Sequence, residues 1–318
     1  MILPYCYIIG QRALRQALEI SYVSPAVGGV LAAGHRGTAK STTVRAFARM
    51  MSGKLPVTLP IGATDDRVLG GWRVENLMAS DAVWQPGLIE EAGAGDEPGM
   101  LYIDEVNLLD DHLTDIILDS ASTGILVVQR ESAREAKQVD FCLVGTMNPE
   151  EGNLRPQLLD RFGLLVWVKS AQLPEERQKI VETVLKFEEE VQNEEAHKGS
   201  SAYIRNGRRK DETRRYDLAA ARGRLPDIGV PDEIYRLAGT IAAEFELEGH
   251  RGELVMLRAA RALAAIESAG EVMPRHVAEV APMALAHRRL TSETGPLLRW
   301  SEHDDEVLAG CVAPAEAS

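Results

Sequence analysis

Eight consecutive residues, Gly34 to Ser41, have the types and the spacing of a loop that binds phosphate groups. Backbone N–H groups of such a loop converge on phosphate oxygens, and the following helix adds its positive N-terminal end. We expect Lys40 to reach the β- and γ-phosphates of a nucleotide and the Ser41 hydroxyl to bind Mg²⁺. The alternative is a glycine- and serine-bearing loop that binds nothing. The predicted phosphate-binding residues are Gly34, His35, Arg36, Gly37, Thr38, Ala39, Lys40, Ser41 and Thr42.

Ala39 departs from the usual pattern of this loop, which has glycine at that position. Alanine adds one methyl group and is the strongest helix former. We therefore expect it to be tolerated if the residue already has helical backbone angles.

Asp104 and Glu105 follow the apolar run Met100–Ile103. This pattern is typical of a buried parallel strand that ends in two carboxylates. In a phosphate-loop protein, Asp104 is expected to hold Mg²⁺, and Glu105 is expected to orient and deprotonate the attacking water. The alternative is an ordinary acidic helix cap after a strand.

Asn148 follows another strand-like run, 139–144, and precedes a proline. At the end of a central strand its amide could face the γ-phosphate beside the carboxylates. Taken alone, an asparagine before proline is more often a turn residue.

Apolar runs separated by helical patterns predict an α/β fold, a parallel sheet sandwiched by helices. Ligands of such sheets bind at the carboxyl ends of the strands, where the loop, Asp104–Glu105 and Asn148 all fall. The charged piece 131–138 is expected to be the tip of a projecting hairpin or loop, and 74–91 a helix with an inserted loop. The expected strands are 28–33, 57–60, 100–103, 124–130, 139–144 and 164–168.

Strand signals vanish after Pro174, and helical patterns at 231–246, 252–268 and 274–289 predict an α-helical domain. The charged stretch 188–226 is expected to be a solvated loop or extended helix ends, because it lacks a hydrophobic period. A nucleic-acid patch there is a weaker alternative, since no interleaved aromatic residues support base stacking. The tail from Ser301 is expected to be frayed. The predicted domains are 1–170 (nucleotide-binding), 171–228 (charged linker and long helix) and 229–318 (helical, with a flexible tail).

The chain has 318 residues, a formal net charge of -13 and a pI of about 5.1. This acidity argues against a protein that coats nucleic acid. Three scattered cysteines lack metal-ligand spacing and suit a reducing cytoplasm. No apolar run approaches the roughly 20 residues of a membrane-spanning helix, and no signal peptide is recognisable. We therefore expect a cytoplasmic protein with neither membrane nor nucleic acid as partner.

Two longer runs, Asp104–His112 and Asn148–Gly163, are highly specific. Together with the phosphate loop, the stretch 62–68 and the run 249–254, they resemble the AAA+ ATPase subunit of magnesium chelatase in its short bacterial form. The resemblance extends from about Ile8 to Arg289. It implies a P-loop AAA+ domain followed by an α-helical lid, ATP and Mg²⁺ as cofactors, and ATP hydrolysis as the activity.

The resemblance also assigns roles that spacing alone does not show. Asn148 matches the sensor-1 position, and Arg161 matches the arginine finger that acts on ATP of a neighbouring subunit. Arg251 matches the sensor-2 arginine of the lid, while Ile9 and Gly10 match a segment near the adenine. Alternatively, both arginines are surface or capping residues.

The implied assembly is a homo-oligomeric ring, a hexamer, that works with a partner bearing a von Willebrand factor A domain. A large tetrapyrrole-binding chelatase subunit is a further candidate partner, and metal insertion into a tetrapyrrole is the implied task. However, the chain is short between Met50 and Gly62, where photosynthetic subunits carry an insertion. Two alternatives therefore stay open: an AAA+ remodelling chaperone for metal insertion or enzyme maturation, and a nucleotide-binding adaptor that does not hydrolyse ATP.

Overall fold

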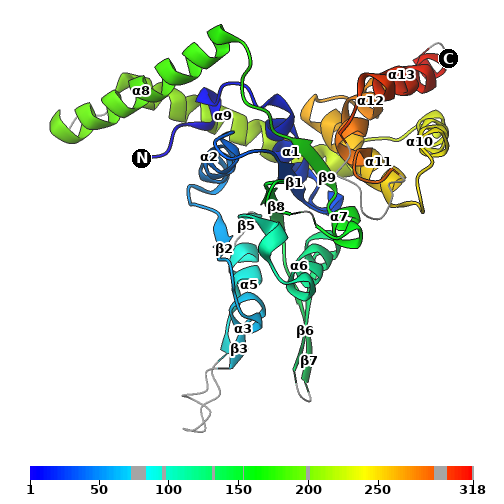
Figure 1. The fold of residues 1–318 in the computed structure, drawn as a ribbon, viewed down its shortest axis with the longest axis horizontal. Coiled ribbons are helices and arrows are strands. Elements are labelled where there is room, and N and C mark those ends of the chain that lie inside the picture. Colours follow the sequence, from blue (N-terminus) through cyan, green and yellow to red (C-terminus); the bar gives the residue numbers. More distant parts are fainter. Residues whose placement is uncertain are drawn as a thin grey trace.

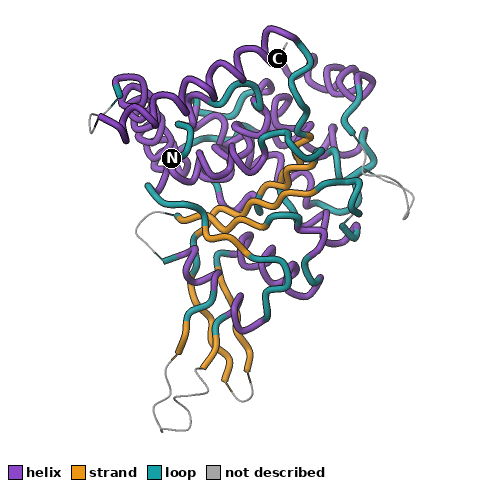
Figure 2. The backbone as a smooth tube through the Cα atoms, turned by 60° about the vertical axis from the view of Figure 1, so that its left-hand side comes forward, coloured by secondary structure: helices purple, strands orange, loops and turns teal. Residues whose placement is uncertain are grey.

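The computed structural model describes residues 1–72, 84–94, 98–130, 133–152, 154–197, 201–289 and 299–316. A parallel sheet stands at its centre, with helices on both faces and a further group of helices to one side (Figure 1). Two narrow strand pairs extend away from the body of the molecule in the same direction (Figures 1 and 2). They are β3 (Gly71–Trp72) with β4 (Trp84–Gln85), and β6 (Ile125–Arg130) with β7 (Ala133–Gln138).

The central sheet consists of β1 (Val30–Ala33), β2 (Val57–Leu59), β5 (Gly99–Ile103), β8 (Phe141–Met147) and β9 (Leu164–Trp167). Its strands pair in the order β2-β5-β8-β1-β9, and every pairing is parallel. Ala33 lies opposite both Met147 and Trp167, so the carboxyl ends of three strands coincide. The prediction of a parallel sheet is confirmed.

Both faces of this sheet are buried, because successive residues of a strand point to opposite sides. Val30 and Ala32 belong to one hydrophobic cluster, whereas Leu31 and Ala33 belong to another. The first cluster includes α1 (Arg12–Val23) and α2 (Lys40–Ser52). The second includes α3 (Asp65–Leu69), α5 (Leu88–Gly93), α6 (Asp111–Thr123) and α7 (Pro156–Arg161). The sheet is therefore sandwiched by helices, as predicted. Short 3₁₀ turns occur at Tyr5–Tyr7, Pro25–Val27, Val106–Leu108 and Leu225–Asp227.

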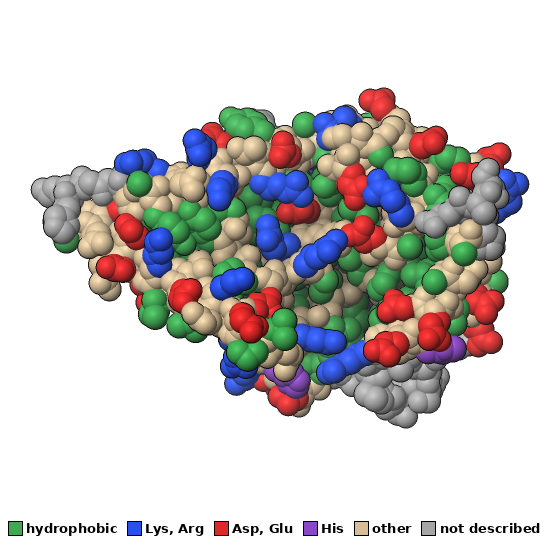
Figure 3. All heavy atoms as spheres, turned by 90° about the horizontal axis from the view of Figure 1, so that it is seen from above, with side chains coloured by type: hydrophobic (Ala, Val, Ile, Leu, Met, Phe, Trp, Pro, Cys, Tyr) green, Lys and Arg blue, Asp and Glu red, His purple; other side chains and the backbone are tan. Residues whose placement is uncertain are grey.

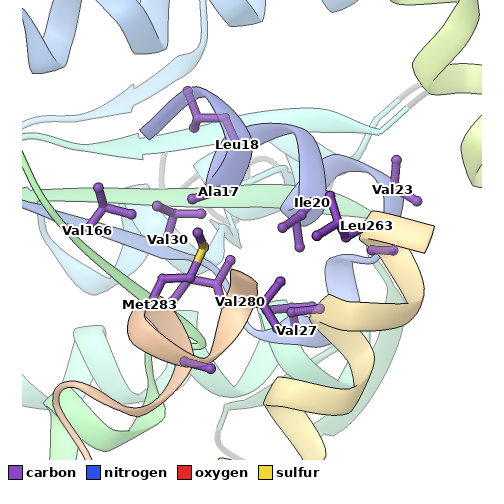
Figure 4. Close-up of a cluster of buried hydrophobic side chains, with 14 of the residues drawn as sticks. Ala17, Leu18, Ile20, Val23, Val27, Val30, Val166, Leu263, Val280 and Met283 are labelled. Atoms are coloured by element: carbon purple, nitrogen blue, oxygen red, sulfur yellow. The ribbon is translucent and has the colours of Figure 1, made fainter. Parts of the chain in front are cut away.

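A helical lid follows, formed by α10 (Asp232–Glu244), α11 (Arg251–Ile266) and α12 (Pro274–Leu285). Its apolar residues join the first cluster: Leu263, Val280 and Met283 lie near Ile20 and Val166 (Figure 4). The lid and the sheet domain thus share a continuous core on one face of the sheet. The expected domain boundaries at 170 and 228 stay predictions.

The charged stretch 188–226 is mostly helical, so of the two expected forms the solvated loop is wrong and the extended helix ends are found. It contains the end of α8 (Pro174–His197) and all of α9 (Ala202–Arg224). Asp211 of α9 accepts hydrogen bonds of 2.8 Å from the backbone N–H groups of Tyr5 and Cys6. Polar contacts of this kind attach α9 to the rest of the molecule, although the helix lacks a periodic hydrophobic face. Acidic and basic side chains are likewise interspersed over the face shown in Figure 3.

The expectation of a frayed tail is also wrong, because residues 302–316 form α13 (Glu302–Glu316). Leu308 and Val312 are buried in the first cluster, and Asp304 forms an ion pair with Arg289. The four-residue spacing of the two apolar side chains places them on one helical face.

A projecting hairpin is confirmed, and β6 is its first strand. The charged piece 131–138 was expected to be the tip, but most of it forms the second strand of the hairpin, β7. Lys137 of β7 is anchored 2.9 Å from Glu90 of α5. The helix expected over 74–91 falls partly outside the described residues, and its described end contains β4 and the start of α5.

Candidate active site

The loop between β1 and α2 depends on two glycines for different reasons. A Cβ on Gly34 would lie 2.3 Å from the carbonyl oxygen of Val168, so no larger residue fits there. Gly37 has a φ of +77°, in the left-handed region that glycine adopts without strain. The sharp path of the loop at the end of β1 therefore follows from these two positions.

Ala39 does not have the right-handed helical angles on which its tolerance was expected to depend. Its φ is 62° and its ψ is 19°, and it caps the N-terminus of α2. The left-handed region costs a residue with a Cβ roughly 1–2 kcal/mol. The loop thus keeps the conformation that glycine usually provides, at the cost of local strain.

The Lys40 ammonium group lies inside the loop. Its Nζ donates hydrogen bonds to the carbonyl oxygens of Gly34 (2.5 Å) and His35 (2.8 Å). Burial lowers the pKa of Lys40, although nearby carboxylates, Asp104 foremost, oppose this shift. A cation therefore stands between the loop and the carboxylates that follow β5.

Ser41, at the start of α2, is linked to Asp104 through a tyrosine that the sequence analysis missed. The Tyr102 hydroxyl lies 2.9 Å from Ser41 Oγ and 2.8 Å from Asp104 Oδ1. Thr146 Oγ1 of β8 donates to the same Asp104 oxygen at 2.7 Å. Burial raises the pKa of Tyr102 to about 12. Strand alternation could have revealed it, because residues two apart point to the same face.

Glu105, Asn148 and Arg36 meet around a fourth residue, Glu151, which the sequence analysis did not single out. The Asn148 amide donates to Glu151 Oε1 at 3.0 Å, and Arg36 Nη2 lies 2.6 Å from the same oxygen. Arg36 Nη2 is also 3.5 Å from Glu105 Oε1. Asn148 is buried, and its amide oxygen accepts a 3.3 Å hydrogen bond from the Glu150 backbone N–H, so protein groups rather than solvent hold both ends of the amide. The loop and the ends of β5 and β8 therefore converge on one polar site.

A largely apolar cavity of about 260 Å³ adjoins the loop. Ile9, Thr38 and Ile180 are among its lining residues, so it lies between the N-terminal segment, the loop and α8. Gln11 Nε2 donates to the Thr38 carbonyl at 3.0 Å and to the Lys169 carbonyl at 3.2 Å. This side chain fixes the N-terminal segment against the loop, where Gly10 (φ +71°) turns the chain.

Arg161 and Arg251 are brought together, but not at the loop. Arg251 Nη2 donates to the Arg161 carbonyl at 3.3 Å, and Arg161 Nη1 forms a 3.0 Å ion pair with Asp115. Arg161 precedes β9, whose first residue pairs with the first residue of β1. Since a strand rises about 3.3 Å per residue, this is the opposite end of the sheet, on the order of 10 Å away from the loop.

Arg288, which sequence reasoning missed, holds the segment after Arg161 in place. It is 9% exposed and donates to Asp160 Oδ1 (3.1 Å) and to the carbonyl oxygens of Asp160 (2.7 Å), Phe162 (2.6 Å) and Gly163 (2.9 Å). Its neighbour His287 donates to the Phe162 carbonyl at 2.9 Å. Burial lowers the pKa of Arg288 to about 10 and that of His287 well below its usual value. No local sequence signal marks this residue.

The donor set at the loop fits Mg²⁺ and a nucleotide. Mg²⁺ prefers oxygen ligands, and the Ser41 hydroxyl and Asp104 carboxylate supply them. In the described part of the chain, Asp104 Oδ2 has no hydrogen-bond donor, in contrast to Oδ1. Lys40 adds a positive charge at the same place.

Comparison with known proteins agrees with this arrangement. Residues 29–162 match the family model of the AAA domain (dynein-related subfamily), and residues 237–307 match that of the AAA lid domain. The chain is 39% identical to the magnesium-chelatase 38 kDa subunit of Acidiphilium rubrum, covering 90% of each chain. It is 35% identical to that of Chlorobaculum tepidum, covering 99% of this chain and 87% of the relative.

Two further similarities are to an uncharacterized protein and to a solved structure. An uncharacterized Mycobacterium tuberculosis protein is 38% identical over 90% of this chain, which spans 44% of that protein. A solved Cytophaga hutchinsonii structure has a TM-score of 0.62 at 16% identity, covering 96% of this chain and 90% of the other, which supports the fold alone. No described helix is both long enough and apolar enough to span a membrane.

Proposed function

Because this chain belongs to the magnesium-chelatase 38 kDa subunit family of AAA proteins, we propose that it hydrolyses ATP and thereby drives a complex of the magnesium-chelatase type. The observation that carries this proposal is the convergence of Lys40, Ser41 and Asp104 at one end of the sheet. Phosphoryl transfer depends on such positioned charges and metal ligands. The proposed task of the complex is insertion of a metal into a tetrapyrrole.

Each group of the site has one task in this proposal. The loop N–H groups and Lys40 bind the phosphates, while Ser41 and Asp104 hold Mg²⁺. The bound ion supplies positive charge that offsets the negative charge of the phosphates. Glu105 accepts a proton from the attacking water, and Asn148 orients that water. On the other side of the loop, Ile9 and Gly10 lie against the base, next to the apolar cavity.

We further propose that the active site is completed by a second copy of the chain. Arg161 and Arg251 lie at the opposite end of the sheet from the loop of their own chain. A closed ring places one face of each subunit against the opposite face of the next. In a hexameric ring, the two arginines would therefore stabilise the nucleotide bound by the neighbour, once Arg161 has left Asp115.

Partners and location follow from the family alone. We propose a partner subunit with a von Willebrand factor A domain, a large tetrapyrrole-binding subunit, and a cytoplasmic location. Movement of the lid relative to the sheet domain during turnover would transmit the energy of hydrolysis to these partners. The shared core of α11, α12 and α1 is the joint about which such movement would occur.

A second candidate function is an AAA+ remodelling chaperone without a porphyrin substrate. The alignment with the Acidiphilium rubrum subunit extends over 324 residues to cover 90% of this chain. The alignment with the Mycobacterium tuberculosis protein covers the same share over 293 residues. The chelatase subunits thus contain residues that this chain lacks, and these are candidates for contacts within the chelatase. Purification with associated proteins distinguishes the two functions: a tetrapyrrole-binding subunit supports the first, and a von Willebrand-type partner alone supports the second.

The first experiment measures ATP turnover with Mg²⁺ and the size of the same sample with and without ATP. Wild-type protein should hydrolyse ATP and assemble into a ring. Glu105→Gln should bind ATP but lose turnover by about 10²–10⁴-fold, because the proton acceptor is gone. Glu212→Gln, on the exposed surface of α9, is the matched control and should behave as wild type.

Two outcomes would contradict the proposal. Full turnover in Glu105→Gln would remove Glu105 from its role. Tight ATP binding without turnover in any assembly would instead favour the nucleotide-binding adaptor.

A further inference from the structure

The hydroxyl groups of Tyr102 and Thr146 both contact one oxygen of the Asp104 carboxylate at the centre of the site. The hydroxyl group of Ser41 in turn contacts that of Tyr102. Tyr102 and Thr146 both contact Asp104 Oδ1, at 2.8 Å and 2.7 Å. Tyr102 also contacts Ser41 Oγ at 2.9 Å, so it bridges the phosphate-loop helix and the strand that carries Asp104. Tyr102 and Thr146 are almost completely buried, which excludes bulk water as a competing partner.

The directions of these hydrogen bonds follow from counting hydrogens. A carboxylate only accepts, and each hydroxyl has one hydrogen to donate. Tyr102 and Thr146 must therefore both donate to Asp104. The single hydrogen of Tyr102 is then used, so Ser41 must donate to the Tyr102 oxygen. The backbone N–H of Glu105 donates to Thr146 Oγ1 at 3.2 Å, so two series of hydrogen bonds, one from Ser41 and one from Glu105, converge on Asp104 Oδ1.

We propose that Tyr102, assisted by Thr146, is a positioning residue that orients both protein ligands of Mg²⁺. Because the hydrogen of Ser41 points toward Tyr102, the lone pairs of Ser41 Oγ stay free for a cation. Because Asp104 Oδ1 is taken by two donors, Oδ2 is the oxygen left for the metal. The inference rests on the proposed function and adds to it the residues that prepare the metal site.

The position of Tyr102 in the fold explains why it can do this. Its ring belongs to the hydrophobic cluster beneath the sheet, together with Val44 of α2 and Val144 of β8. Because the Tyr102 ring is closely packed, it cannot shift when a neighbouring side chain moves. Its hydroxyl group is therefore held in a fixed position between α2 and β5. Hydrogen bonds to a metal ligand commonly decide its orientation, and their loss lowers metal affinity by about 10–100-fold.

The test uses Tyr102→Phe in the full chain, with a fluorescent ATP analogue as the probe. Affinity for the probe is measured in EDTA and then as a function of Mg²⁺ concentration. We expect unchanged affinity in EDTA, because the loop and Lys40 are untouched. The Mg²⁺ concentration for half-maximal tightening should rise about 10-fold or more. Thr146→Val should give a smaller rise, since Tyr102 still holds Asp104.

The matched control is Tyr5→Phe. Tyr5 is a buried tyrosine of the same cluster whose hydroxyl contacts Glu19 at 3.2 Å, on the side of α1. The Tyr5→Phe variant should have a lower thermal stability but an unchanged Mg²⁺ concentration for half-maximal tightening of the probe. If Tyr102→Phe weakens probe binding equally in EDTA and in Mg²⁺, or shifts neither, the positioning role is wrong. If the wild type gains no affinity from Mg²⁺, the proposed function itself fails.

Discussion

The two ends of the central sheet carry charged groups of different kinds, held in different ways. At the carboxyl ends of the strands, Asp104 and Ser41 are joined through Tyr102 by short hydrogen bonds among buried groups. At the opposite end, Arg161 and Arg251 extend from helix termini and are about one-third exposed. The groups at the first end are held by buried hydrogen bonds, whereas the cations of the second are partly exposed and held by ion pairs.

The second end contains a contrast of its own. Arg288 donates to four backbone carbonyls, three of them in the segment 160–163, and is almost fully buried, so its removal would leave these carbonyls without this donor. Arg161 has an ion pair with Asp115 at a partly exposed site, which is weak and exchangeable. Arg288 therefore fixes the segment that carries Arg161, while the Arg161 side chain is held only by an exchangeable ion pair.

The largest expected effect is that of Arg161→Ala on turnover. An arginine that stabilises the charge of phosphoryl transfer contributes about 10³–10⁵ in rate. We expect the variant to bind ATP and assemble normally but to lose turnover by about 10³-fold, measured as steady-state hydrolysis. Arg155→Ala removes a similar ion pair, 2.7 Å from Asp111, just before the same helix, and should stay within about 2-fold of wild type.

Mixing variants sharpens the contrast between the two ends. Arg161→Ala lacks only the proposed arginine finger, and Glu105→Gln lacks only the proposed proton acceptor. In a mixed ring, about a quarter of the sites would combine an intact acceptor with an intact neighbouring finger, because each interface joins two copies. Activity recovered on mixing supports action between subunits. A mixture as inactive as its components would assign Arg161 to its own chain or to no catalytic role.

The next effect is on stability. Arg288→Leu should lower the free energy of unfolding by about 3 kcal/mol, because it leaves buried carbonyls without donors. The change in the free energy of unfolding is measured by urea denaturation. Arg275→Leu removes an exposed ion pair with Glu267 in the same helical domain and should cost less than about 1 kcal/mol. Equal stability of the two variants would show that Arg288 does not hold the lid against the Arg161 segment.

These two ends also differ in how far the sequence predicts them. Lys40, Ser41 and Asp104 follow a strand–loop–helix pattern and an apolar run, which are local and therefore readable. Arg288 acts on Asp160 across 128 residues, and Asp211 acts on Tyr5 across 206, so nothing near them in the sequence indicates the contact. The catalytic roles of the predicted site residues stay predictions.

Some missed features did have a local signal. Tyr102 lies two residues before Asp104, and strand alternation places both on the same face. Leu308 and Val312 are four residues apart, as on one face of a helix, although the tail was expected to be frayed. The conformation of Ala39 also had a signal, because the usual pattern of the loop has glycine at that position, and glycine is the residue that adopts the left-handed region without strain.

A smaller effect concerns pH at the lid end. His287 is buried beside Arg288, and burial lowers its pKa well below the usual value. Below about pH 6.5 the unfolded chain takes up a proton that the folded chain refuses, so stability falls as pH falls. The slope contributed is at most about 1.4 kcal/mol per pH unit. In His287→Asn, unfolding measured between pH 7.5 and 5.5 should depend less on pH; an unchanged dependence would mean that His287 titrates normally.

The smallest effect lies at the phosphate-loop end, in the strained angles of Ala39. Ala39→Gly removes roughly 1–2 kcal/mol of left-handed strain but restores about 0.4–1 kcal/mol of unfolded-chain entropy. We therefore expect a net gain of about 0.5–1 kcal/mol in the free energy of unfolding, measured by urea denaturation. Gly53→Ala is the mirror control at the other end of α2: its φ is +70° and no atom lies within 4 Å of the added Cβ. It should lose about what Ala39→Gly gains, because only the backbone conformation matters there. A loss in Gly53→Ala without a gain in Ala39→Gly would mean that contacts of the Ala39 methyl group offset its strain, and that the loop is adapted to alanine.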